Sequence, residues 1–234
     1  MPSIKIKNWK LALLSLLLIY LFTHLGFWQL ARAKQKKLLL QSFAERTEQA
    51  PLAATALKKL TDFRFYQARL QGHFDNTHTF LLDNKIVNGQ IGYEVYTPFY
   101  AEQFTNVILV DRGFIAMNAN RQILPLIPPI LGMTTITGML NLPPTYFAWG
   151  KMTDSTQLNW PLRIEFIHLQ EIAQLLAQPL FSYTLSLSPH DPRAFPIQWQ
   201  IVTMGPEKHI GYAIQWFALA LTLLILSVAL NWKR

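Results

Sequence analysis

Two long apolar stretches lie near the ends of the chain, at residues 9–30 and 209–231, and a polar segment of mixed composition separates them. Each stretch can cross a hydrocarbon layer of about 30 Å, because a helix rises about 1.5 Å per residue. The pattern predicts two transmembrane helices that flank one extramembrane domain, residues 31–208. The short tails, residues 1–8 and 232–234, are then expected on the opposite side of the membrane.

The first apolar stretch also has features of a secretory signal peptide. Three lysines lie among the first ten residues, and Ala31-Arg32-Ala33 fits a small-residue cleavage pattern. The stretch is longer than a signal-peptide core, however, and Trp9 and Trp28 are spaced like two interfacial aromatic anchors. We therefore expect an uncleaved span. No Arg-rich and Ser-rich transit sequence precedes it, which favours a bacterial inner membrane over a mitochondrial protein.

The middle segment is rich in β-branched and aromatic runs that turn residues separate. Asn88-Gly89 is a tight-turn signal, because both residues tolerate positive φ. The first helix is expected to continue to about Gln49, and an amphipathic pattern predicts another helix at residues 166–176. The predicted strands are residues 63–70, 79–82, 92–97, 107–110, 134–140, 181–187 and 198–203. The fold class is therefore an α+β membrane protein, with an antiparallel or barrel-like extramembrane sheet and one or two helices.

Charge is distributed unevenly along the chain, whose net charge is +8. All 13 acids and 16 of the 21 bases lie in the middle segment, so that segment is only mildly basic and nucleic acid is not an expected partner. The basic tails are typical of cytoplasmic anchors, although bases also follow the first span. Long domains cross the membrane largely regardless of charge, so we expect the middle domain in the periplasm. Cysteine is absent, which excludes disulfides and thiolate sites.

Two histidines lie in or beside the predicted spans, where an ionisable side chain is costly and often functional. His209 opens the second span, and Tyr212 and Trp216 follow it by three and seven residues, on one side of a helix. An imidazole beside an aromatic stripe is suited to a haem macrocycle, while an interfacial aromatic belt explains the same pattern. His24 lies within the first span, and Gln215 is a further polar residue in the second.

The remaining candidate residues favour structural roles. A surface or capping role is favoured for the four other histidines, and Gly113 after the apolar run at residues 107–110 is typical of a bulge. Arg112 is expected to pair with an acid or to shape a loop. No phosphate-binding loop, zinc motif or nucleophile elbow occurs, so an enzyme is not expected. The four histidines are His73, His78, His168 and His190.

Six segments, in order along the chain, resemble the motifs of the surfeit locus protein 1 family. They are LGFWQLAR at residues 25–32 followed by Lys34 and Lys36, GHFD at 72–75, GYEVYTPF at 92–99, VILVDRGF at 107–114, NW at 159–160 and EKHIGYAIQWF at 207–217. Two departures from the family pattern occur. Asp111 stands where that family usually has asparagine, and Asn159 directly precedes Trp160, whereas the family has one residue between the asparagine and the tryptophan. The resemblance covers most of the chain and includes the predicted topology.

This resemblance implies an assembly factor for a haem–copper respiratory oxidase, a cytochrome c oxidase, that aids delivery or insertion of haem a into the catalytic subunit. It implies a chaperone of the bacterial inner membrane with its central domain in the periplasm. The oxidase catalytic subunit, other assembly factors and the lipid bilayer are its expected partners. His209 is the candidate ligand of the haem iron, and Tyr212 and Trp216 would lie beside the porphyrin. In the haem-handling hypothesis, Arg32 or a neighbouring base would meet the propionates.

Two other functions are also considered. A cofactor-free scaffold would hold oxidase subunits in an assembly intermediate through the spans and the extramembrane sheet. A sensor or transport accessory would need a cytoplasmic output domain, whereas both expected tails are short. The role of His24 stays open, as does the choice between a cytochrome c and a quinol oxidase as the target.

Overall fold

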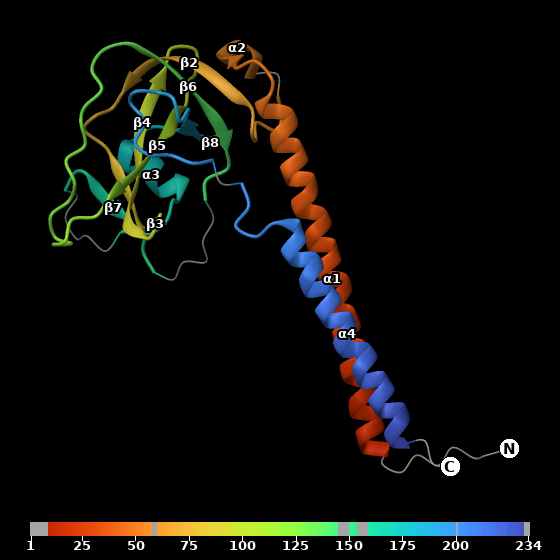
Figure 1. Cartoon of the computed structure of the whole chain (residues 1–234). Coiled ribbons are helices and arrows are strands. Elements are labelled where there is room, and N and C mark those ends of the chain that lie inside the picture. The colour runs from red at the N-terminus through yellow and green to blue at the C-terminus, as the bar shows by residue number, and fades with distance from the viewer. Residues whose placement is uncertain (1–8, 58–59, 145–149, 154–158, 200, 232–234) are drawn as a thin grey trace. The chain divides into compact units, whose positions relative to one another are not determined.

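The structure is a computed structural model that describes residues 9–57, 60–144, 150–153, 159–199 and 201–231 (Figure 1). The tails expected at residues 1–8 and 232–234 lie outside these residues. The described chain forms two compact units. One takes its residues from 1–42 and 200–234 and is helical, and the other, residues 43–199, contains the sheet.

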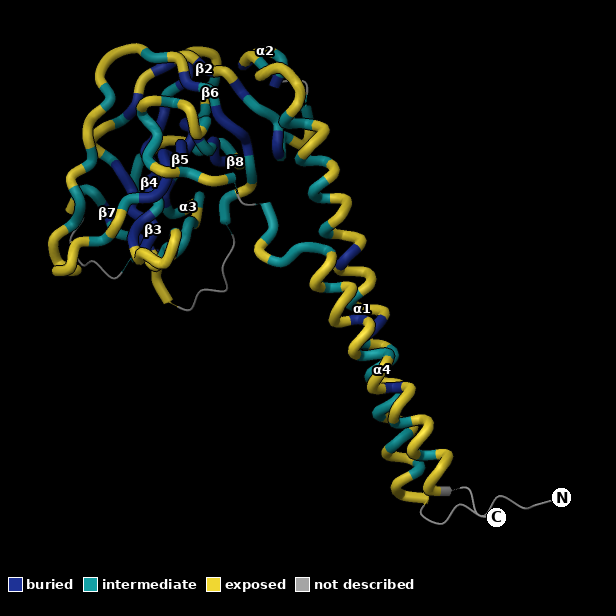
Figure 2. The backbone as a smooth tube through the Cα atoms, in the orientation of Figure 1, coloured by how far each residue is buried: buried dark blue, intermediate teal, exposed yellow. Residues whose placement is uncertain are grey.

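The helical unit is built from α4, Pro206–Asn231, and from the long helix α1, Trp9–Thr47, except for the last five residues of α1, which belong to the sheet unit. Both helices are long and apolar enough to cross a membrane. Most of their apolar side chains are exposed (Figure 2), which suits a hydrocarbon environment rather than water. The predicted continuation of the first span is confirmed, because α1 is unbroken from Trp9 to Thr47 and ends before Pro51.

The sheet unit contains a closed barrel. Strands β2 (Gln67–Phe74), β6 (Thr134–Asn141), β8 (Leu180–Leu187), β5 (Val107–Ala116) and β4 (Gln90–Ala101) pair in that order, and β2 also pairs with β4 to close the ring. Beyond the ring, β3 (Phe80–Val87) pairs with β4, β7 (Leu162–Ile164) with β3, and β1 (Leu52–Ala53) with β2. Two short helices, α2 (Ala54–Leu57) and α3 (Leu169–Leu176), complete the unit.

The predicted α+β class with a barrel-like sheet is confirmed. Most neighbouring strands are antiparallel, whereas β5–β8, β3–β7 and β1–β2 are parallel. The hairpin expected at Asn88-Gly89 joins β3 to β4, and the two residues have φ of 50° and 78°. Six of the seven predicted strands overlap observed ones. The first begins later, at Gln67, because Phe65 has a left-handed φ of 67° that interrupts extended backbone.

The strand predicted at residues 198–203 is wrong for the described residues of that segment, which form no strand. Both neighbours of β8 are occupied, by β5 and β6, so the ring offers no free edge beside it for another strand. The segment contacts the barrel through a side chain instead, because the indole Nε1 of Trp199 donates a hydrogen bond to the Leu187 carbonyl at 3.2 Å.

Two apolar clusters pack on opposite faces of β5. Successive side chains of a strand point to opposite sides, so Ile108 and Val110 enter the cluster that contains Phe99 and Leu140. Leu109 enters the other, with Ile172 of α3. Strands β4 and β5 are accordingly buried along most of their length, whereas β2 alternates between buried and more exposed residues (Figure 2).

Candidate functional site

Helix α4 begins at Pro206, a residue suited to a first helical turn because its missing N–H would have no intrahelical partner there. His209 follows within this turn. Its Nδ1 lies 2.7 Å from Oε1 of Gln29 on α1, and the pair is partly buried. The amide oxygen is an acceptor, so Nδ1 carries the hydrogen, and in the neutral imidazole Nε2 carries the lone pair.

This hydrogen bond leaves one nitrogen of His209 available. Among the residues that the structure describes, Nε2 makes no hydrogen bond. Histidines that ligate metals commonly donate their other ring N–H to an oxygen acceptor, which fixes the ring and raises its basicity. Gln29 gives His209 that arrangement. Gln29 could have been noticed in the sequence, because it is a polar residue inside an apolar stretch. Its role becomes clear only from its contact with His209, which is distant in the sequence.

The aromatic residues after His209 do not share one environment. Tyr212 is 45% exposed, whereas Trp216 packs against Phe22 of α1 with ring centroids 5.6 Å apart. Gln215, the polar residue noted in the second span, is exposed. The expected stripe is therefore divided. Tyr212 is accessible beside His209, and Trp216 holds the two helices together.

The two helices pack closely at Gly26. A Cβ on this residue would lie 2.6 Å from the ring of Phe217, which itself packs edge-on against Phe27 at 5.2 Å. Buried Ala213 and Ala220 continue the contact along α4. Small residues allow such close packing in a membrane. The interior of the helix pair is thus filled by side chains, so a flat ligand at His209 would lie on its outer surface.

Arg32 lies one turn beyond Gln29 on α1. Its side chain is exposed, its Nη1 donates to Oε1 of Gln35 at 3.2 Å, and its guanidinium carbon lies 5.5 Å from the ring centroid of Trp28. Arg32 is therefore close to His209 along the helix axis, because three residues correspond to about 4.5 Å of rise. Its accessible guanidinium is suited to a carboxylate or phosphate.

His24 takes a different position. It is exposed, and its ring lies 6.3 Å from that of Tyr20 on the same helix. Two residues separate His24 from Gly26, a rotation of about 200°, so His24 lies on the side of α1 away from α4. The structure brings His209 together with Gln29 and not with His24.

Other histidines pair locally within the sheet unit. Nδ1 of His78 lies 2.6 Å from Oδ2 of Asp75, and the His78 ring packs on Trp160 at 4.7 Å. His168 occupies the N-cap of α3 and pairs with Glu171 at 3.1 Å. Within the described ranges, no group of three or more histidine or carboxylate side chains is arranged to hold a metal ion.

A buried carboxylate lies in the barrel wall. Asp111 is 3% exposed and accepts hydrogen bonds from Ser186 Oγ at 2.8 Å and from the Gly113 N–H at 2.9 Å. Burial, and then the nearby Glu94, raise the pKa of Asp111 to about 8. The Asp111 side chain therefore keeps its proton to a higher pH than an exposed carboxyl group does. The φ of Gly113 is 104°, and the β4–β5 register is irregular here, which confirms the expected bulge.

Arg112 shapes a loop, and among the described residues it forms no ion pair, although the charge of Asp191 acts on it. Both of its terminal nitrogens donate to the Pro128 carbonyl at 3.2 Å, and its guanidinium carbon lies 5.0 Å from the Phe195 ring centroid. Burial lowers the pKa of Arg112 to about 10, a value at which it stays charged at neutral pH. Its role is thus to fix the segment that contains Pro128.

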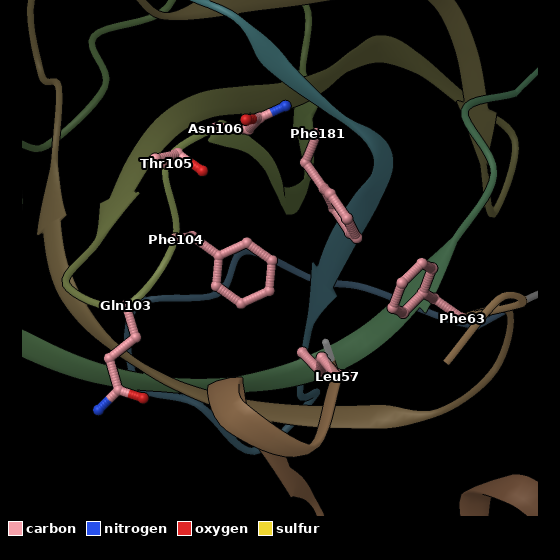
Figure 3. A pocket seen from close by; sticks show the side chains of 7 residues that line it. All are labelled: Leu57, Phe63, Gln103, Phe104, Thr105, Asn106 and Phe181. Atoms are coloured by element: carbon pink, nitrogen blue, oxygen red, sulfur yellow. The ribbon is translucent and has the colours of Figure 1, made fainter. Parts of the chain in front are cut away.

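A small cavity of about 270 Å³ lies in the sheet unit, between α2 and the segment that joins β4 to β5 (Figure 3). Phenylalanine rings point into it, and amide and hydroxyl groups lie at its rim. Pockets for drug-sized ligands usually exceed about 300 Å³, so this cavity is too small for a macrocycle. Its lining residues are Leu57, Phe63, Gln103, Phe104, Thr105, Asn106 and Phe181.

Comparison with known proteins gives one consistent result. The model of the SURF1 family matches residues 16–221. The chain is 26% identical to a SURF1-like protein of Rickettsia bellii over 86% of this chain and 83% of that one, and 24% identical to surfeit locus protein 1 of Xenopus tropicalis over 83% and 67%. It is also 28% identical to the cytochrome oxidase assembly protein SHY1 of Saccharomyces cerevisiae, over 40% of this chain and 25% of that one.

Proposed function

The chain belongs to the SURF1 family, and from this premise we propose that it is a membrane-anchored assembly factor for a haem–copper respiratory oxidase and is not itself a catalyst. The observation that carries the proposal is the family match over residues 16–221, which covers the whole barrel and most of both candidate spans. A relative named as a cytochrome oxidase assembly protein supports the same role. The expected partners are the oxidase catalytic subunit and other assembly factors.

The proposed location is a bacterial inner membrane, with the barrel in the periplasm. Two helices of sufficient length and hydropathy, and relatives from Rickettsia, support a bacterial membrane protein. The segment that contains the barrel is long enough to be translocated to the periplasm regardless of the bases that follow the first span. Both ends of the chain would then lie in the cytoplasm.

Haem a is the proposed cofactor, bound transiently. The residues present fit it in one respect: Nε2 of His209 is available while Nδ1 is held by Gln29. The haem iron would accept a nitrogen ligand when bound, and neutral imidazole is a suitable one. Tyr212, exposed beside His209, would contact the porphyrin, and the accessible guanidinium of Arg32 would meet the propionates. Trp216 would act indirectly, by holding α4 against α1 through Phe22.

A second candidate is a scaffold that binds oxidase subunits without a cofactor. One observation favours it: Leu126 and Leu131 are 91% and 80% exposed in a segment that the protein holds in place. Asn76 donates from Nδ2 to the Ile130 carbonyl at 3.0 Å and accepts from the Ile130 N–H at 2.8 Å, and Arg112 holds Pro128. Exposed apolar side chains on a fixed segment are typical of a protein-binding surface.

An optical spectrum of the full chain tests the haem proposal. The protein would be purified in mild detergent from cells that make haem a, beside His209→Ala and the matched control His24→Ala, which removes an exposed histidine from the same helical unit. We expect a reduced haem a band in the wild type and in His24→Ala, and its loss in His209→Ala. Gln29→Leu should lower the affinity for haem about 10- to 100-fold, because residues that orient a metal ligand typically contribute that much. The band should weaken accordingly.

A band that persists in His209→Ala would refute the assignment of the ligand. The scaffold would be favoured by two results together. The band would be absent from the wild type and all variants, and oxidase subunits would co-purify with the wild type but in smaller amounts with Leu126→Ser/Leu131→Ser. The assembly role itself is tested by deleting the gene and measuring oxidase activity and haem a content of the membranes. Normal values for both would contradict it.

A further inference from the structure

Basic side chains gather where the two membrane helices leave their apolar stretches. Arg32, Lys34, Lys36 and Lys37 follow the apolar part of α1, and Lys208 precedes His209 on α4. Together these five residues are termed the basic collar. Within residues 9–42 and 201–231, the acidic side chains amount to Glu207 alone. The collar therefore carries a strong positive charge that the helical unit itself does not neutralise.

The collar is accessible and unpaired. Arg32, Lys34, Lys37 and Lys208 are exposed, and Lys36 is half-buried. In the described part of the chain, none of the five forms an ion pair with a carboxylate, and Arg32 bonds only to the neutral amide of Gln35. Their cationic groups are thus free to meet an anion from outside the chain.

The depth of the collar matches one layer of lipid headgroups. Five residues separate Arg32 from Lys37, a rise of about 7.5 Å, and one headgroup layer is roughly 5–8 Å thick. The Gln29–His209 bond brings the first turn of α4 to this level, so Lys208 belongs to the same layer. Trp28, 45% exposed under the Arg32 guanidinium, is an interfacial aromatic residue at the lower edge of the collar.

The bases also spread over about 200° of the circumference of α1 rather than forming one stripe. On a helical projection, Arg32 and Lys36 lie on one side of the buried Ala33, and Lys37 and Lys34 lie on the other. A single compact anion would contact only part of this set. Several phosphate groups distributed around the helices would contact all of it, which is the arrangement that a bilayer surface provides.

From this charge complementarity we propose that the basic collar binds the phosphate groups of anionic phospholipids in the leaflet that it meets. Lysine and arginine at a membrane surface each contribute about 1 kcal/mol of attraction to anionic lipid. The inference can be tested apart from haem binding and oxidase assembly, because the variants that test it change Lys34 and Lys37 and leave His209, Arg32 and the barrel intact.

The test titrates the full chain, in mild detergent, with phosphatidylglycerol or with phosphatidylcholine. Native mass spectrometry measures how much of each lipid the protein retains. The collar variant is Lys34→Gln/Lys37→Gln. The matched control is Arg69→Gln/Lys151→Gln, which removes two exposed bases from the sheet unit. We expect the wild type and the control to prefer phosphatidylglycerol, and the collar variant to lose this preference by roughly 10- to 30-fold, from two contributions of about 1 kcal/mol.

A charge-preserving variant, Lys34→Arg/Lys37→Arg, keeps the test independent of folding and should retain the preference. An unchanged preference in Lys34→Gln/Lys37→Gln, or an equal loss in the control, would overturn the proposal. Displacement of bound phosphatidylglycerol by excess inorganic phosphate would also overturn it, because the collar would then be a site for free phosphate.

Discussion

Replacement of Asp111 by asparagine should stabilise the barrel and remove much of its pH dependence. The folded protein raises the pKa of Asp111 from 3.8 to about 8, first through burial and then through Glu94, while Ser186, Gly113 and Lys85 oppose the shift. The folded state therefore binds a proton that the unfolded state has released between these two values. Stability from this group is present below about pH 4 and is lost as the pH rises toward 8.

The magnitude follows from the width of that window. Each unit of pKa displacement corresponds to about 1.4 kcal/mol, so the full window represents up to about 6 kcal/mol. Asparagine has no proton to take up. Its Oδ1 can accept the Gly113 N–H, and its Nδ2 can donate to Ser186 Oγ, where Asp111 now has two bonds. One amide hydrogen would remain unpaired at a cost of about 1–3 kcal/mol, which leaves a net gain of up to roughly 3–5 kcal/mol near pH 8.

The assay measures the free energy of unfolding of the full chain in detergent at about pH 5 and pH 8. Near-ultraviolet circular dichroism monitors the unfolding. The wild type should lose stability between these values, and Asp111→Asn should change far less. Glu102→Gln, which alters an exposed carboxylate, serves as the control and should shift stability by less than about 0.5 kcal/mol. A wild type that gains stability as pH rises, or a variant that is less stable at pH 8, would show that Asp111 is ionised in the folded barrel and refute the reasoning.

Three further predictions concern helix packing, the exposed segment and a second carboxylate. Gly26→Leu should separate α1 from α4, because even a Cβ at this residue would lie 2.6 Å from the Phe217 ring; disulfide trapping between engineered cysteines on the two helices would fall relative to Gly211→Ala, where a Cβ meets nothing within 4 Å. Asn76→Ala should remove both bonds to Ile130 and cost about 1–2 kcal/mol, with faster amide hydrogen exchange there as the measurement. Burial raises the pKa of Asp191, but hydrogen bonds and charge from Arg193 lower it more, to below 3.8; Asp191→Asn should therefore destabilise the protein near neutral pH and matter progressively less as the pH falls, which acid titration of unfolding would measure.

Much of the architecture could be predicted from local sequence. The hairpin at Asn88-Gly89 was predictable because few residue pairs adopt two successive positive φ values without strain. The amphipathic helix near residues 166–176 was also predictable, although it begins at Leu169 because His168 takes an extended N-cap conformation. The strand expected at 198–203 could not be judged from composition, since its formation depends on a free sheet edge.

The candidate site was predictable in part. His209 was identified because histidine at the end of an apolar stretch is unusual, but its orientation depends on Gln29, 180 residues away. Periodicity placed Tyr212 and Trp216 on one side of a helix, whereas packing against Phe22 gave them different environments. No local pattern contains that information, because each contact joins segments far apart in the chain.

By itself, the sequence determined two membrane-length helices, a β-rich domain between them and a family resemblance. These features depend on residue type, on short-range periodicity and on the cost of placing polar groups in hydrocarbon. Only the tertiary structure decided that β2 pairs with β4 to close the ring, that Asp111 is buried within its wall, and that Gln29 fixes the ring of His209. Their physical reason is shared: each depends on which surfaces remain available after distant segments have packed, and that is a property of the whole fold.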